Sequence, residues 1–202
     1  MVADDSSRQP RLPTDPAPGS ILPERHPLAP QVGSVIGNHY PMCFGCGLSH
    51  PTGLHMRVVS GEGLRITAEF EVTASHQGAP GLAHGGLLAA ACDEALGALN
   101  WALQRPAVTA RLETDFRRPV PVESVVYLDA QIIGVHGRKV YARGTGRLDG
   151  PDGPEAISAA ALFIQVPIEH FVEHGRAEDV DQAAADRAAG HGPTFSTFDV
   201  NP

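Results

Sequence analysis

The chain has 202 residues, of which 42% are hydrophobic and 19% are charged, and its formal net charge at pH 7 is −8. This length predicts one domain with extensions. No apolar run reaches the roughly 18 residues of a membrane-spanning helix, and no clustered basic face indicates nucleic-acid binding, so we expect neither partner. Three cysteines argue against a disulfide framework. With no apolar leader in residues 1–20, they favour a cytoplasmic protein.

The two ends of the chain differ in composition from its body. Residues 1–35 hold seven of the eighteen prolines and show no apolar periodicity, which predicts a disordered or extended leader, either floppy or draped over a partner. Regular structure is expected to begin near residue 38. Residues 168–202 carry more than half of the net charge and form an acidic extension, with weak helical character over about 178–189. We therefore expect the folded domain to span residues 36–167.

The body predicts one helix among several strands. Residues 54–60 and 64–72 alternate loosely around Gly61-Glu62-Gly63, as in a hairpin. A helix is expected over about 85–103, closed by Pro106. Four further strands follow at 108–118, 125–135, 139–148 and 156–166, and Pro167 ends the last of them. A single helix can be buried only if a curved antiparallel sheet wraps around it, so the pattern predicts an α+β fold.

The predicted helix has two distinct faces. One face is an apolar stripe that should pack against the sheet, formed by Leu88, Ala91, Cys92, Ala95, Leu96, Leu99 and Leu103. The other face consists mainly of very small residues and also carries a carboxylate; its members are Gly86, Ala90, Asp93, Gly97 and Asn100. Small residues allow another chain or a ligand to approach closely. A buried carboxylate is costly unless it has a task or a partner, so Asp93 is a candidate catalytic group.

The start of this helix is a second candidate feature. His84-Gly85-Gly86 places bare backbone N–H groups where they can polarise a carbonyl. Asp93 lies nine residues after His84, which is roughly 13 Å along the helix axis. The two features therefore cannot act on one carbon within one chain. If both are catalytic, a two-fold dimer with antiparallel helices must bring them together.

Several motifs resemble a known family. His84-Gly85-Gly86 with an acid nine residues after His84 resembles the hotdog-fold acyl-CoA thioesterases, in particular the PaaI-like branch. The same resemblance extends to Cys43-Phe44-Gly45-Cys46-Gly47 with Pro51-Thr52-Gly53-Leu54, to Thr109-Ala110-Arg111-Leu112, and to Phe116-Arg117-Arg118-Pro119-Val120. It covers about residues 40–167. It implies a hotdog fold, a homodimer or homotetramer, and active sites at the dimer interface.

The resemblance also implies roles for individual residues. Asp93 takes the position of the catalytic carboxylate, which acts as a general base on water or as a nucleophile. Gly85 takes the position whose N–H polarises the thioester carbonyl. His84 borders the site, and Thr109 matches a hydroxyl that helps to hold the water.

The predicted substrate-binding residues rest on different kinds of argument. They are Gly86, His76, Gln77, Arg117 and Arg118, the two arginines being suited to CoA phosphates. Many relatives carry Asn or Gln a few residues before the HGG motif. Here Gly78 stands six residues before His84, with His76 and Gln77 beside it, so the contribution of this loop is open.

Each candidate also has a structural interpretation. Asp93 could pair with an arginine or cap a neighbouring backbone, and Glu94 could be the working acid instead. His84 could only shape its loop, Thr109 could be an ordinary β-branched strand residue, and Arg117 and Arg118 could form a solvated surface.

The segment before the first hairpin contains a possible metal-binding pattern. His39, Cys43, Cys46 and His50 have the spacing H-x3-C-x2-C-x3-H, which could close a tetrahedral zinc site. The family resemblance implies no metal, and we expect no cofactor. Without a metal, the two cysteines would be small apolar fillers near the substrate. Cys92 lies on the core stripe and should be inert.

These observations favour an acyl-CoA thioesterase. The first alternative is a non-catalytic acyl-CoA or lipid-binding protein with the same fold. The second is a zinc-stabilised interaction protein built around residues 39–50. A hotdog hydratase is disfavoured because no Asp/His pair has the short spacing of such enzymes. The sequence does not determine the acyl group, since the pocket depends on side chains at the dimer interface.

Overall fold

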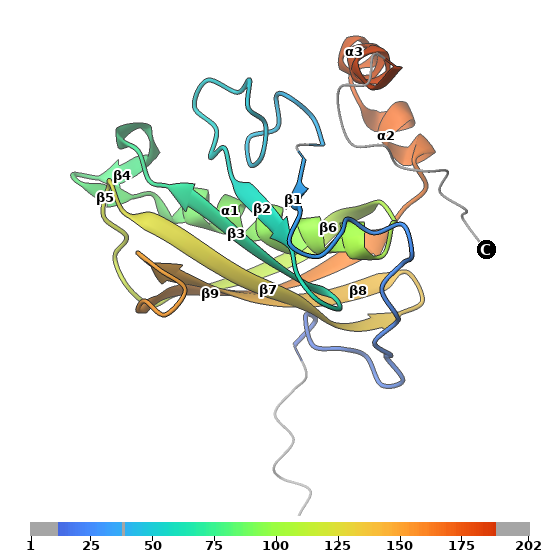
Figure 1. Ribbon diagram of the computed structural model, residues 1–202, viewed down its shortest axis with the longest axis horizontal. Coiled ribbons are helices and arrows are strands. Elements are labelled where there is room, and N and C mark those ends of the chain that lie inside the picture. Colours follow the sequence, from blue (N-terminus) through green and yellow to red (C-terminus); the bar gives the residue numbers. More distant parts are fainter. Residues whose placement is uncertain (1–11, 38, 189–202) are drawn as a thin grey trace, which may run out of the picture.

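The computed structural model describes residues 12–37 and 39–188, and its centre is one long helix held in a curved antiparallel sheet (Figure 1). The sheet has seven strands in the order β1-β2-β3-β7-β8-β9-β6. Their bounds are β1 Val35–Ile36, β2 Arg57–Ser60, β3 Arg65–Glu71, β6 Ala107–Phe116, β7 Val125–His136, β8 Lys139–Leu148 and β9 Glu155–Gln165. The predicted α+β architecture is therefore confirmed.

Helix α1, Gly85–Ala98, packs against β3, β6, β7, β8 and β9. All seven residues of the predicted core stripe are buried. Full burial of each large apolar side chain contributes about 1.5–3 kcal/mol, so this stripe fixes which face of the helix meets the sheet. The outer face, with Asp93 and Gly97, remains partly exposed.

Two predicted boundaries need correction. The helix was expected to reach residue 103, but it ends at Ala98 and tightens into the 3-10 helix η2, Leu99–Ala102, where the Asn100 amide donates to the Gly97 carbonyl at 3.1 Å. The strand expected to reach residue 118 ends at Phe116. There the backbone N–H groups of Arg117 and Arg118 both turn to the carbonyl of Ala156.

Short elements flank the core. The 3-10 helix η1, Ala74–His76, leads into a small hairpin of β4, Gln77–Ala79, and β5, Leu82–Ala83, directly before α1. After β9 come α2, Glu169–His174, and α3, Ala177–Ala188. α3 coincides closely with the predicted weak helix, whereas α2 was not predicted because six residues carry too little periodicity to indicate a helix. Among the described residues, no helix is both long and apolar enough to cross a membrane.

The N-terminal segment is structured earlier than expected. Ile21 forms an antiparallel bridge with Val135, with backbone hydrogen bonds of 3.0 and 2.8 Å. Thr14 is 1% exposed, and its hydroxyl donates to Glu113 at 2.7 Å. β1 pairs with β2. Residues 12–37 thus contact the sheet of their own chain, whereas the sequence indicated a disordered or extended leader, either floppy or draped over a partner. Residues 1–11 of the predicted leader lie outside the described residues.

Candidate active site

The outer face of α1 brings one pair of predicted site residues together. The Thr109 hydroxyl, from β6, donates a hydrogen bond to Asp93 Oδ1 at 2.8 Å. Asp93 is only half-buried within this chain, which corrects the expectation of a buried carboxylate. The pair borders a cavity of about 400 Å³ whose other walls include Trp101, Phe163 and Phe171. One carboxylate oxygen is therefore held by Thr109, at the edge of a partly apolar hollow.

The start of α1 forms a second feature. His84 is the N-cap residue, and its Nδ1 accepts the N–H of Gly86 at 2.9 Å. The first N–H groups of a helix have no acceptor within the helix. Among the described residues, none accepts from the N–H of Gly85. The histidine thus uses one of the predicted N–H groups, which removes Gly86 as a donor to a ligand, and leaves Gly85 as the available one.

A second hollow surrounds this helix start. It has a volume of about 520 Å³ and is lined by His84, Gly85, Phe116, Arg117 and Arg118, among others. A methyl group added at Gly85 would lie 3.5 Å from the Phe116 ring, so helix start and strand end are in close contact. The hollow shares no lining residue with the cavity beside Asp93. One chain therefore presents the two candidate catalytic features at separate places, as the helix spacing predicts.

The remaining predicted substrate-binding residues occupy varied positions. His76 is 2% exposed, its Nδ1 accepts the N–H of Thr73 at 3.0 Å, and burial lowers its pKa. The Gln77 side chain spans its own turn by accepting from Gly81 at 2.7 Å and donating to Ala74 at 3.0 Å. These three hydrogen bonds favour structural roles for the two side chains in the loop before α1.

Arg117 and Arg118 are exposed at the rim of the hollow beside Gly85. Arg117 lies 3.2 Å from the Asp115 carboxylate and 3.7 Å from that of Glu155. Arg118 donates from Nε to the Glu155 carbonyl at 3.1 Å. Among the described residues, the other guanidinium nitrogens of these two side chains have no hydrogen-bond acceptor, so they could donate to an anionic ligand.

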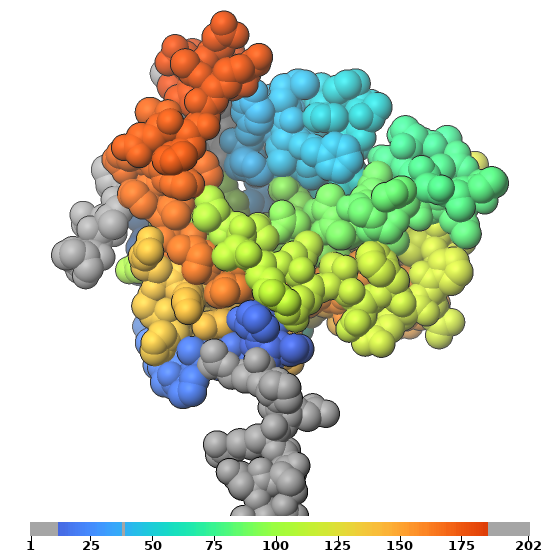
Figure 2. Space-filling view, turned by 180° about the vertical axis from the view of Figure 1, so that it is seen from behind, coloured from blue at the N-terminus to red at the C-terminus, as the bar shows by residue number. Residues whose placement is uncertain are grey.

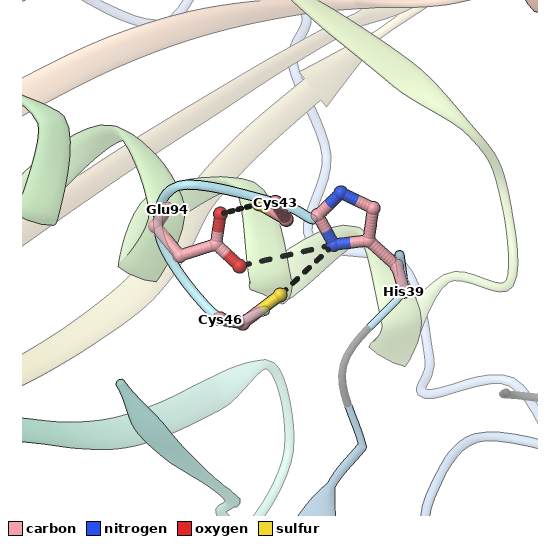
Figure 3. A group of neighbouring side chains, drawn as sticks. All are labelled: His39, Cys43, Cys46 and Glu94. Atoms are coloured by element: carbon pink, nitrogen blue, oxygen red, sulfur yellow. Dashed lines mark hydrogen bonds and ion pairs between the residues drawn. The ribbon is translucent and has the colours of Figure 1, made fainter. Parts of the chain in front are cut away.

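A cluster of chemically reactive side chains adjoins the Asp93 cavity. His39, Cys43 and Cys46 come from residues 39–56, here called the cysteine loop, and Glu94 comes from α1 (Figure 3). The four candidate ligand atoms all lie within 4.8 Å of one another. His50, the fourth member of the sequence pattern, is absent from the cluster. Its Nδ1 accepts the N–H of Thr52, and its ring packs edge-on against Phe44.

The cluster shifts the acidity of its members. Hydrogen bonds from Cys46 hold the pKa of the Cys43 thiol far below its ordinary value, and the same contact raises the pKa of Cys46. Burial raises the pKa of Glu94, and the hydrogen bond with Cys43 raises that of His39. Cys92 is different, because burial, together with the charge of the neighbouring Asp93, raises its pKa to about 12.

Glu94 is the main residue of this region whose position the sequence did not reveal. It was considered only as an alternative to Asp93, yet the two carboxylates point to different neighbours: Asp93 reaches Thr109, and Glu94 reaches Cys43 at 3.5 Å. Adjacent helical residues point about 100° apart. Two adjacent acids on the helix therefore indicated that one of them faces away from the Asp93 site. The loop that covers Glu94 could not be predicted from the local sequence pattern.

Comparison with known proteins identifies the fold and its relatives. Residues 80–153 match the model of the thioesterase superfamily. The acyl-coenzyme A thioesterase THEM4 of Xenopus laevis is 32% identical over 102 residues, which are 50% of this chain and 46% of that protein. The chain thus spans about half the length of the curated relatives it matches.

Solved structures share the architecture. A crystal structure of a thioesterase superfamily protein aligns with a TM-score of 0.56 at 24% identity, covering 68% of this chain and 70% of that one. The E. coli PaaI protein of the phenylacetic acid degradation operon aligns with a TM-score of 0.53 at 17% identity, covering 56% and 81%. These likenesses confirm the predicted hotdog fold.

Proposed function

Because the chain carries a hotdog domain of the thioesterase superfamily, we propose that it hydrolyses acyl-CoA thioesters to a free acid and CoA. The observation that carries the proposal is the hydrogen-bonded pair of Asp93 and Thr109 at the edge of a cavity of about 400 Å³. The curated relatives named as acyl-coenzyme A thioesterases support the substrate class.

Asp93 is the group that activates the attack. Thr109 donates to Oδ1, so Oδ2 is left to accept a proton from water as general base. The water oxygen then bonds to the thioester carbonyl carbon, the C–S bond breaks, and the thiolate leaves with the proton. In the alternative chemistry, Oδ2 itself bonds to the carbonyl carbon, the C–S bond breaks, CoA thiolate leaves, and water hydrolyses the resulting anhydride. Single-turnover hydrolysis in ¹⁸O-water tests this route, because ¹⁸O enters Asp93 only when water attacks the Asp93 carbonyl of an anhydride.

The Gly85 N–H is the proposed donor to the developing oxyanion. It lies at the positive end of the α1 dipole. A preorganised donor at this point is worth about 10²–10³-fold in kcat. His84 orients the helix start by capping Gly86, and Arg117 and Arg118 are placed to bind CoA phosphates at the rim of the same hollow.

A second copy of the chain completes the site. Within the described residues, β6 is the last strand of the sheet and pairs with β9 alone. Antiparallel pairing of β6 with its copy, about an axis near Leu112, would bring Thr109 of one chain opposite Phe116 of the other. Because Phe116 adjoins Gly85, the helix start of one subunit would then meet Asp93 of its partner. A homodimer is the minimal active unit in this proposal, and a homotetramer contains the same site.

The proposal extends to the organisation of the chain. Residues 36–167 would form the catalytic domain, preceded by the extended N-terminal segment and followed by the acidic extension. The enzyme would act in the cytoplasm without a cofactor, and neither nucleic acid nor membrane would be a partner. The domain limits can be tested by measuring hydrolysis by a chain trimmed after residue 167.

The central experiment measures hydrolysis over acyl-CoAs of graded length, aromatic acyl groups included, together with an active relative as positive control. Substitution of Asp93→Asn should leave the dimer intact and lower kcat by about 10²–10⁴-fold, since it removes the general base. Wild-type turnover in this variant would contradict the catalytic assignment. Saturable binding without any turnover by the wild type would instead favour a non-catalytic acyl-CoA-binding protein.

A further inference from the structure

The cluster of His39, Cys43, Cys46 and Glu94 has the dimensions of a tetrahedral metal site. Cys46 Sγ lies 3.2 Å from His39 Nδ1, Cys43 Sγ lies 3.5 Å from Glu94 Oε2, and His39 Nδ1 lies 3.8 Å from Glu94 Oε1 (Figure 3). A tetrahedral zinc ion with ordinary bond lengths separates its ligand atoms by about 3.3–3.8 Å. The side chains therefore need only small movements to enclose such an ion.

The donor set selects the kind of ion. Two sulfurs and one imidazole nitrogen are soft or borderline ligands that favour zinc, whereas calcium and magnesium prefer oxygen ligands alone. One carboxylate completes four protein ligands, which is the number found in closed structural zinc sites. Binding would release the remaining thiol protons, because thiolates are the metal-ligating form.

The cysteine loop is shaped to hold these ligands. A methyl group added at Gly45 would lie 2.4 Å from Glu94 Oε2, so the loop backbone presses directly on the carboxylate. Gly47 donates its N–H to the Cys43 carbonyl at 2.9 Å, and Met56 donates to Gly45 at 2.9 Å. These bonds close the turn between the two cysteines and fasten it to the start of β2. The loop stands above helix α1 and apart from strands β7–β9 (Figures 1 and 2).

We propose that His39, Cys43, Cys46 and Glu94 bind one zinc ion, which ties the cysteine loop to the middle of helix α1. Met42, Phe44 and Leu48 of the same loop are exposed, so these side chains do not anchor the loop by hydrophobic packing. The zinc ion would supply an attachment of the loop to the helix. Its ligand Glu94 follows Asp93 directly in the chain, so the zinc site would also steady one wall of the Asp93 cavity, which His39 and Cys43 line. His50 is outside the ligand set.

The test is the metal content of the full chain, purified without chelators and without a metal-affinity column. Inductively coupled plasma mass spectrometry should find about one zinc per chain. Glu94→Gln and Cys43→Ser should each lose most of it. His50→Asn and Asp93→Asn are matched controls in the same loop and helix, and both should retain it. Circular dichroism of every variant separates loss of zinc from loss of folding.

Cobalt substitution supplies a second readout that does not depend on activity. The wild-type protein reconstituted with Co²⁺ should show thiolate-to-cobalt charge-transfer bands, and Cys43→Ser should weaken them. The proposal is overturned if wild-type protein retains no zinc after addition and dialysis, or if the chain contains a Cys43–Cys46 disulfide in place of metal. It is equally overturned if His50→Asn loses zinc while Glu94→Gln keeps it.

Discussion

Strands β9 and β6 are neighbours in the sheet and differ sharply in their surroundings. β9 is paired on both edges and buries alternate side chains against α1, whereas β6 is paired on one edge and has no buried residue. The opposite edge of the sheet ends in β1, which has only two residues. A long uncovered edge is a template for pairing with another chain. β6 is therefore an exposed edge strand, whereas β9 is an interior strand of the sheet.

The proposed catalytic groups lie next to the two ends of this edge strand. Thr109, which holds Asp93, lies near its start, and Phe116, which contacts Gly85, is its last residue. Figure 2 shows the face on which this strand lies. No residue of β6 is buried within the described part of the chain. In the proposed dimer, a second copy paired at β6 supplies the contacts that complete the site.

The largest expected effect is on the free energy of unfolding, which a substitution in β9 should lower far more than one in β6. Ile157 of β9 and Phe116 of β6 lie directly opposite one another, yet Ile157 is 1% exposed and Phe116 is 53% exposed. Ile157→Ala should lower the free energy of unfolding by about 2–5 kcal/mol, because it leaves a cavity in the core. Chemical denaturation measures this loss.

Phe116→Ala is the matched variant. It should change the unfolding of an isolated subunit little but weaken dimerisation, which sedimentation velocity over a dilution series detects. A Phe116→Ala protein that loses as much stability as Ile157→Ala at every concentration would show that β6 is an interior strand after all.

The next effect concerns the helix start beside Phe116. Gly85→Pro should lower kcat by about 10²–10³-fold, because proline has no N–H to donate to the oxyanion. Proline is well tolerated at the first position of a helix, and the extended backbone of His84, with ψ of 132°, suits a residue before proline. Gly85→Ala keeps the N–H and should stay close to wild type in a steady-state assay.

Mixed dimers then test whether the site crosses the interface. Dimers formed at random from equal amounts of Asp93→Asn and Gly85→Pro chains should recover about a quarter of wild-type activity, since half are mixed and one of their two sites is intact. A site contained within one chain would give no recovery.

The sequence predicted the order of the long helix and the main strands. It did not predict the parts of the fold that depend on contacts between residues far apart in the chain. The strand predicted at 139–148 is observed as Lys139–Leu148, because alternating side chains on a half-buried strand are a local signal. The docking of residues 12–37 was not predicted, since Thr14 meets Glu113 across 99 positions of the chain. For the same reason, the sequence offered His50 as the possible fourth member of the cysteine cluster, whereas the structure places Glu94 there.

A smaller effect probes the pair at the start of β6. Thr109→Val preserves the β-branched shape that suits a strand but removes the hydroxyl that holds Asp93 Oδ1. We expect kcat to fall about tenfold, which corresponds to about 1.4 kcal/mol and to the loss of one hydrogen bond. Thr109→Ser retains the hydroxyl and should recover most of the activity. Equal activity in the valine and wild-type proteins would make Thr109 an ordinary strand residue.

The smallest effect concerns the other face of β6, which the N-terminal segment covers. The Thr14 hydroxyl donates to Glu113 and, together with Arg111, lowers the pKa of that carboxyl. A lowered folded-state pKa contributes stability above the ordinary pKa, and this stability is lost as the pH falls through the folded value. Thr14→Val removes one hydrogen bond to this carboxylate and should cost about 0.5–1.5 kcal/mol at pH 7.

As the pH falls through the lowered pKa of Glu113, wild type and Thr14→Val should converge in their free energies of unfolding. Urea denaturation at a series of pH values measures the difference. A gap that is constant from pH 7 to pH 3 would mean that Thr14 acts through packing alone. A gap that closes would show that a charge-dependent contact secures one face of β6 to the N-terminal segment of its own chain.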